Sequence, residues 1–276
     1  MNRVMPESTI TKATHPGSKN PDQDMAALSG MEEVKDKINE IVARANYDKA
    51  HGKKGEGFSS HYVFYGAPGT GKTTFARILT GFLYKNKIIK NQCIEVDGNL
   101  LKASAPGEGG MKAEILVKYA MGGVLFIDEA YSMAEGYGNE AVDTLIKLME
   151  DMRGQFVLIL AGYTKPMANL LSSNPGFRSR IKDYLEFPDY TTDEAEAIFK
   201  SMANKAGLKV SREGLEKFRE RYEIELPKAD FGNARTVRNI LDEAISKHAL
   251  RLTKDKKAKE NLLTSADISS ESRKII

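Results

Sequence analysis

The chain has 276 residues, which is enough for two domains with a well-developed core. Its 41% hydrophobic and 29% charged content is typical of a globular protein, and 41 basic against 38 acidic residues give no support to bulk nucleic-acid binding. No apolar run is long enough to cross a membrane, so a membrane partner is not expected. With Cys93 as the single cysteine and no secretory signal, we expect a cytoplasmic protein.

The first part of the chain divides into a leader and a region in which strands alternate with helices. Residues 1–24 carry three prolines among small polar residues without apolar periodicity, so we expect a disordered leader. Alternation of strands and helices then indicates a parallel sheet in an α/β domain. Residues 103–112 are expected to be a mobile loop. Five apolar segments are expected to be strands: 62–65, 93–96, 124–127, 156–160 and 184–187.

The strands end near residue 190, and helical periodicity continues to about residue 252. Thr191 and Glu194 have the spacing of a capping box, and Gly207 stands where that helix would end. Ser211 opens a second helix and Val237 lies in a third. A solvated helix end is the best interpretation of the four lysines in residues 254–259.

The segment between the first strand and the next helix matches the P-loop pattern G-x-x-x-x-G-K-[ST]. Its glycines let successive N–H groups turn inward around phosphate oxygens, and the helix N-terminus adds partial positive charge. The lysine reaches the β and γ phosphates, and the next threonine hydroxyl is an Mg²⁺ ligand. We predict a site for ATP and Mg²⁺ formed by Gly66, Pro68, Gly69, Thr70, Gly71, Lys72, Thr73 and Thr74.

The strand at 124–127 runs directly into Asp128 and Glu129. Two carboxylates therefore lie at the C-terminal edge of the sheet, where ligands bind in α/β folds. We expect Asp128 to hold the Mg²⁺ shell together with Thr73, and Glu129 to orient or deprotonate the attacking water. This acidic pair indicates hydrolysis rather than nucleotide storage.

Residues 174–180 form a third cluster, a loop with Pro and Gly that carries Arg178 and Arg180. Exposed loop arginines are commonly just solvated charge. This loop, however, follows the fourth strand, and we expect it close to the catalytic edge. Beside a P-loop, the cluster favours an arginine finger offered to the γ-phosphate of a neighbouring subunit, where it neutralises charge in the transition state.

Together with residues 160–163 and 232–235, these motifs resemble AAA+ ATPases, and more narrowly the CbbX and stage V sporulation protein K group. They are also similar to the C-terminal ATPase domain of EccA. The resemblance runs from about residue 28 to about residue 252. It implies an AAA+ P-loop parallel sheet sandwiched by helices in residues 25–190, with a smaller, all-helical lid domain in residues 191–276. The fourth strand would lie between the P-loop strand and the Asp-Glu strand.

The resemblance further implies a homo-oligomeric, hexameric ring with ATP at subunit interfaces and a protein client. Arg180 corresponds best to the arginine finger, with Arg178 close behind. Arg235 corresponds to the sensor 2 arginine, which contacts the nucleotide and couples its state to the domain angle. Tyr163 or Thr164 would occupy the sensor 1 region.

One departure from this group concerns the pore loop. Ring remodellers typically carry an aromatic residue there, but residues 104–108 read Ser-Ala-Pro-Gly-Glu. This puts peptide threading, and Rubisco activation in particular, in doubt. Residues 131–137 are a second candidate pore segment, for which a flexible loop before a helix is an equally good interpretation.

We therefore expect an AAA+ ATPase that couples ATP hydrolysis to remodelling or assembly of a protein partner. A nucleotide-dependent assembly or scaffold protein without peptide threading is one alternative, favoured by the missing aromatic residue. A nucleic-acid motor or loader is another, which the near-neutral charge and the lack of a DNA-binding module disfavour.

Overall fold

The computed structural model describes residues 4–52, 60–135, 139–255 and 258–271. They divide into two compact units, each described here by itself. The first comprises Met1–Ala27, Glu32–Gly66 and Gly71–Phe187. The second comprises Leu28–Met31, Ala67–Thr70 and Pro188–Ile276.

The first unit is built on a six-stranded sheet in the order β1-β3-β4-β5-β2-β6. All pairs are parallel except the one between β1 and β3. The five expected strands are present, and β5 lies between β4 and the P-loop strand β2, as the resemblance implied. The strands are β1 (Thr14–His15), β2 (His61–Gly66), β3 (Cys93–Asp97), β4 (Val124–Asp128), β5 (Val157–Gly162) and β6 (Ile181–Phe187).

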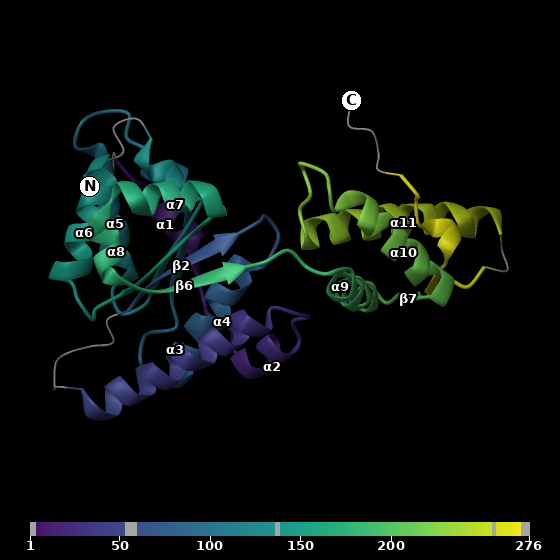
Figure 1. The fold of residues 1–276 in the computed structure, drawn as a ribbon, viewed down its shortest axis with the longest axis horizontal. Helices are drawn as coiled ribbons and strands as arrows, with labels where there is room; N and C mark the ends of the chain where they lie inside the picture. The colour runs from purple at the N-terminus through teal and green to yellow at the C-terminus, as the bar shows by residue number, and fades with distance from the viewer. Residues whose placement is uncertain (1–3, 53–59, 136–138, 256–257, 272–276) are drawn as a thin grey trace. The chain divides into compact units, whose positions relative to one another are not determined.

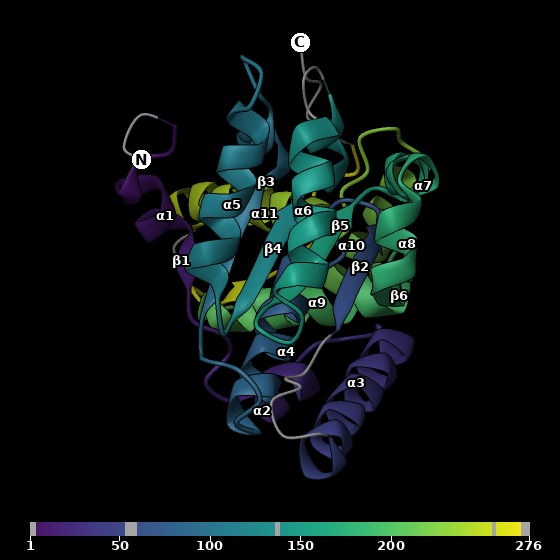
Figure 2. The ribbon, with the colours of Figure 1, turned by 90° about the vertical axis from the view of Figure 1, so that its left-hand side faces the viewer.

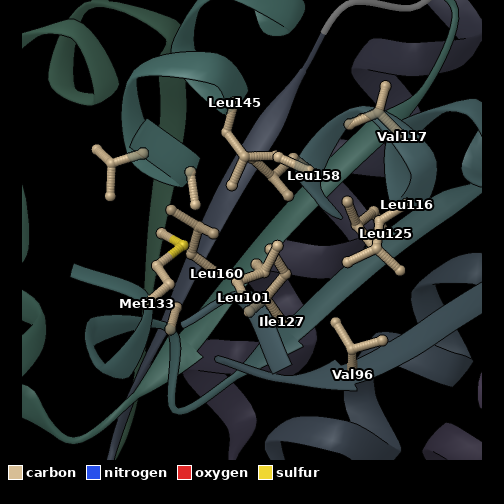
Figure 3. Packing of buried hydrophobic residues seen from close by; sticks show 14 of the residues in the cluster. Val96, Leu101, Leu116, Val117, Leu125, Ile127, Met133, Leu145, Leu158 and Leu160 are labelled. Carbon is tan, nitrogen blue, oxygen red and sulfur yellow. The ribbon is translucent and has the colours of Figure 1, made fainter. Parts of the chain in front are cut away.

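Helices cover both faces of this sheet (Figures 1 and 2). One face carries α5 (Glu108–Ala120), α6 (Asn139–Asp151), α7 (Thr164–Ser173) and α8 (Pro175–Arg180). Fully buried side chains of β4 and β5, such as Leu125 and Leu158, pack there against Leu116 and Leu145 (Figure 3). The other face carries α3 (Glu32–His51) and α4 (Lys72–Lys85). Phe75 of α4 meets the ring of Phe187 there, with centroids 5.5 Å apart.

Residues 1–3 of the expected leader lie outside the described residues, and residues 4–24 are not disordered as their composition predicts. They form α1 (Glu7–Ala13), β1 and α2 (Pro21–Ala26). Met5 and Ile10 are only 4% and 3% exposed and join the main hydrophobic core. Gly17 lies so close to α4 that a Cβ on it would be 2.7 Å from the Gly81 nitrogen. Two isolated apolar anchors give no periodic signal, but they are enough to dock the segment on the sheet.

Two loop expectations in the first unit are also corrected. Helix α5 begins at Glu108, so only part of residues 103–112 is loop. Residues 175–180 form the short helix α8, with Pro175 in its first turn, where the missing N–H of proline costs no helical hydrogen bond. The short 3-10 helices η1 (Gly98–Leu101) and η2 (Ala130–Ala134) follow β3 and β4.

The second unit consists mainly of α9 (Thr192–Lys205), α10 (Arg212–Glu225) and α11 (Ala234–Lys254). The expected capping box of Thr191 and Glu194 is confirmed. The lid is not all-helical, because β7 (Lys209–Val210) pairs in parallel with β8 (Leu262–Leu263), which precedes η3 (Ser265–Asp267). Leu263 is fully buried in the core of this unit, so the chain beyond the lysine-rich segment folds back onto it.

Candidate nucleotide-binding site

The P-loop begins where β2 ends, and its backbone conformation depends on glycine. A Cβ on Gly66 would lie 2.1 Å from the Phe187 oxygen of the neighbouring strand, so no side chain fits there. Gly69 and Gly71 have φ values of +71° and +98°, in the left-handed region that favours glycine. These residues give the chain room to curl around a phosphate group.

Lys72 is the first residue of α4 and is 8% exposed. Its Nζ donates to the Gly66 oxygen at 2.9 Å and lies 5.9 Å from the ring centroid of Tyr163. Thr73 follows half-buried in the same helical turn, and Thr74 is exposed. The cation and the helix N-terminus are therefore both at the carboxyl end of β2, as phosphate binding requires.

The tip of the loop, Ala67–Thr70, belongs to the second unit. Thr70 is fully buried, and its hydroxyl donates to the Ala67 oxygen at 2.9 Å. Three successive carbonyls accept hydrogen bonds within this unit: Pro68 from Asn233 Nδ2 at 3.3 Å, Gly69 from the Ala234 N–H at 3.2 Å, and Thr70 from the Tyr190 hydroxyl at 3.1 Å. With its carbonyls engaged in this way, the tip has a defined conformation.

The acidic pair lies at the carboxyl edge of the sheet. Asp128 ends β4, directly beside Asp97 of β3, and accepts the Glu129 N–H at 3.0 Å. Glu129 has a φ of +46°, a left-handed conformation that is uncommon for residues other than glycine. Such conformations cluster at functional sites because the surrounding structure must hold them in place.

Two tyrosines surround Glu129. The Tyr163 hydroxyl lies 3.5 Å from Glu129 Oε1, and the Tyr163 ring is 5.9 Å from that of Tyr131. Burial and the nearby charge of Glu129 raise the pKa of Tyr131 to about 12, so its phenol stays protonated. Of the two sensor 1 candidates, Tyr163 is the residue near the Glu129 carboxylate, whereas Thr164 is exposed at the start of α7.

The structure corrects the expected position of the two arginines. Helix α8 ends at Arg180, and the next residue, Ile181, pairs with His61 at the start of β2. Because β2 and β6 are parallel, the arginines lie at the amino edge of the sheet, opposite the edge that carries Glu129. The earlier expectation failed because α7 and α8 lead the chain back across the sheet after β5.

The two arginines differ in their surroundings. Arg180 Nε forms an ion pair with Glu150 of α6 at 3.3 Å, and its Nη1 donates to the Gly176 oxygen at 3.1 Å. Arg178 is exposed, and no side-chain hydrogen bond or ion pair links it to the other described residues. In the second unit, Arg235 is exposed in the first turn of α11, where its N–H donates to the Gly232 oxygen at 2.9 Å.

The donor set fits Mg²⁺. Among the residues that the structure describes, no three His, Cys, Asp or Glu side chains gather into a metal cage. Mg²⁺ commonly uses one or two protein oxygens together with phosphates and water. The Thr73 hydroxyl and the Asp128 carboxylate are hard oxygen donors of this kind, and both lie in the first unit.

Within the described residues, no helix is both long and apolar enough to traverse a bilayer.

Sequence reasoning missed two contributors to this region. Asp97 stands beside Asp128 on the neighbouring strand, and it accepts the Asn99 N–H at 2.7 Å to cap η1. Asn233 holds the loop tip, whereas the resemblance assigns a role only to Arg235 in the same Gly-Asn-Ala-Arg segment. The available signals were a polar residue directly after the expected strand 93–96 and an asparagine just before an expected helix.

Comparisons with known proteins agree with this geometry. Residues 62–189 match the ATPase family associated with various cellular activities (AAA), and residues 191–275 match the AAA lid domain. The lid match corrects the expected end of the resemblance near residue 252, because it includes the lysine-rich segment and β8. A crystal structure of the FIGL-1 AAA domain with ADP superposes with a TM-score of 0.69 at 17% identity, covering 95% of this chain and 88% of that one.

Three relatives align over most of their length. Stage V sporulation protein K of Bacillus subtilis is 37% identical and covers 92% of this chain and 82% of its own. Protein CbbX of Cereibacter sphaeroides is 38% identical, and the alignment covers 82% of this chain and 76% of CbbX. The chloroplastic ribulose bisphosphate carboxylase/oxygenase activase of Cyanidioschyzon merolae is 38% identical, and the alignment covers 82% of this chain and 80% of the activase. The chain therefore belongs to the AAA+ ATPases, in the group of stage V sporulation protein K and CbbX, and is an ATP hydrolase.

Proposed function

We propose that this ATPase couples hydrolysis to the remodelling or assembly of a protein partner, as a homo-oligomeric, hexameric ring in the cytoplasm. The observation that carries the proposal is the separation of charges between the two edges of the sheet. Lys72 and Glu129 lie at the carboxyl edge, and Arg178 and Arg180 lie at the amino edge. Arginines so placed can reach a γ-phosphate only in another subunit.

Each group has a chemical role in this proposal. Lys72 and, from a neighbouring subunit, Arg180 take up charge that develops on the transferred phosphoryl group. Thr73 and Asp128 would hold Mg²⁺, which neutralises phosphate oxygens when bound. Glu129 activates the attacking water, and the Tyr163 hydroxyl keeps its carboxylate oriented.

Arg235 would contact the nucleotide as the sensor 2 arginine. Its place in the first turn of α11, beside the Gly232 oxygen, supports this role. A Cβ on Gly69 would lie 3.2 Å from the Arg235 nitrogen, so the backbone of this turn approaches the tip of the P-loop. Arg178, whose side chain pairs with none of the described residues, is the second candidate for the finger.

The pore loop favours a second candidate, an assembly protein that does not thread peptides. Ser104, Ala105 and Pro106 are exposed and offer no aromatic ring. A hydrogen bond and an ion pair also hold the two ends of this loop. Gly107 donates its N–H to Glu140 Oε2 at 2.6 Å, and Lys102 pairs with Glu135 at 2.6 Å. Two residues of the second candidate pore segment, 136 and 137, lie outside the described residues.

The test uses the Glu129→Gln variant. It should bind ATP as the wild type does, but hydrolyse it about 10² to 10⁴ times more slowly, because the base is lost. Held in ATP, it should retain its protein partner during affinity capture from host lysate. Equal turnover by wild type and variant would contradict the role of Glu129. Stimulation by DNA instead of by captured proteins would contradict a protein partner.

A further inference from the structure

Asn233 is the residue before α11, and its backbone is unusual. Its φ and ψ are +51° and −121°, a combination that residues with a side chain rarely adopt. The residue is fully buried. A conformation of this kind persists only where surrounding contacts hold it, so those contacts identify what the residue does.

The side-chain amide of Asn233 is fully engaged. Its Nδ2 donates to Asp189 Oδ1 at 2.7 Å and to the Pro68 oxygen at 3.3 Å, while its Oδ1 accepts the Tyr190 N–H at 2.9 Å. Two acceptors face the nitrogen and one donor faces the oxygen, which fixes the orientation of the amide. One side chain thus joins the P-loop tip, the chain entering the second unit and the start of α11.

The backbone around Asn233 approaches the P-loop tip closely. A Cβ on Gly69 would lie 2.0 Å from the Gly232 oxygen, so the two backbones are in direct contact. The Ala234 N–H donates to the Gly69 oxygen at 3.2 Å. Arg235 follows in the same helical turn. The conformation of Asn233 therefore determines how this turn meets the loop.

We propose that Asn233 is a positioning residue of the ATP site. By holding the Pro68 carbonyl, it fixes the peptide planes of the loop tip and so aims the loop's N–H groups at the phosphates. It also sets the first turn of α11, which carries Arg235, against the same loop. This inference rests on the proposed function of the loop, but it concerns nucleotide affinity and not turnover or the protein partner.

The test exchanges donor and acceptor between two residues. In Asn233→Asp, the bond from Tyr190 remains possible, but a carboxylate oxygen faces the Pro68 oxygen and Asp189. Adding Asp189→Asn restores a hydrogen bond between positions 233 and 189 with its direction reversed. The bond to Pro68 stays lost, because aspartate at position 233 has no N–H to donate. The double variant therefore separates anchoring of the chain entering the second unit from anchoring of the loop.

The measurements are the binding of a fluorescent ADP analogue with MgCl2 and the thermal midpoint. We expect Asn233→Asp to lower both, with affinity about threefold to tenfold weaker for the loss of a buried hydrogen bond. The double variant should recover the midpoint but not the affinity. Asp189→Asn alone should bind as the wild type does. If Asn233→Asp does not fold, the double variant is compared with Asp189→Asn, since the two differ only at position 233.

Asn239→Asp is the matched control, because it makes the same change at an exposed position of α11. Recovery of affinity together with the midpoint in the double variant would overturn the proposal and leave Asn233 a structural residue. Unchanged affinity in a folded Asn233→Asp protein would do the same. Failure of the wild type to couple ATP turnover to a protein partner would overturn the proposed function alone.

Discussion

Replacing Gly98 by alanine should impair catalysis without touching the nucleotide loop. Gly98 opens η1, and a Cβ there would lie 2.4 Å from the Glu129 oxygen, whereas ordinary van der Waals contact begins at 3.4 Å. The two backbones must therefore separate by about 1 Å. A displacement of about 1 Å at a catalytic group can cost about 100-fold in rate. We expect kcat to fall by about this factor.

The assay for Gly98→Ala combines steady-state ATP hydrolysis with nucleotide binding. Affinity should stay within about twofold of the wild type, because Lys72 and the glycine loop are unchanged and one factor of two is only about 0.4 kcal/mol. Gly110→Ala is the control. A Cβ on Gly110 would lie 2.9 Å from the rotatable Thr144 hydroxyl and 3.9 Å from the next atom, the Glu140 oxygen, and alanine suits the interior of α5. Its rate should match the wild type.

Two results would refute this reasoning. Wild-type turnover by Gly98→Ala would show that the position of the Glu129 backbone does not limit the rate. An equal loss of nucleotide affinity and rate would show that the change had spread to the P-loop. Thermal unfolding separates both results from a general loss of stability.

Three further predictions concern stability. Burial lowers the pKa of His61 from 6.5 to about 4, so the unfolded chain binds the proton more tightly than the folded chain. About 3 kcal/mol of folding free energy should therefore be lost as the pH falls from 6.5 to 4. Urea unfolding of His61→Gln should show a shallower dependence of stability on pH than the wild type, and an equal dependence would contradict the assignment. Removing residues 1–19, with buried Met5 and Ile10, should cost at least about 3 kcal/mol, whereas a dispensable leader predicts no change in urea midpoint. Asp183→Asn should cost about 1 to 3 kcal/mol in the same assay, because Asp183 is 7% exposed and pairs with Arg44; a change below about 0.5 kcal/mol would contradict this.

Local patterns predicted the backbone geometry of the candidate nucleotide site. The P-loop needs glycines at left-handed positions and a lysine at a helix start, and these requirements are met within eight adjacent residues. Asp128 and Glu129 follow an apolar strand, and a parallel strand delivers its last residues to the ligand edge. Parts of a site that are formed by residues adjacent in the sequence can therefore be predicted from the sequence alone.

Features that depend on distant contacts were not predicted. The N-terminal segment is ordered because Met5 and Ile10 dock on a core formed by residues far along the chain. The strand β8 pairs with β7, from which it is separated by two helices. Only the path of α7 and α8 shows that Arg180 reaches the amino edge. No local pattern in the sequence contains these pairings.

Mixing two inactive variants tests most directly whether the hydrolytic site is shared between subunits. Glu129→Gln retains Arg180 but lacks the base, and Arg180→Ala retains the base but lacks the proposed finger. Each alone should hydrolyse ATP at least about 100 times more slowly than the wild type. In mixed assemblies, an Arg180→Ala subunit beside a Glu129→Gln subunit has a complete site, so turnover should reappear and peak at intermediate ratios. Turnover that never exceeds that of the separate variants, at any ratio, would contradict the account.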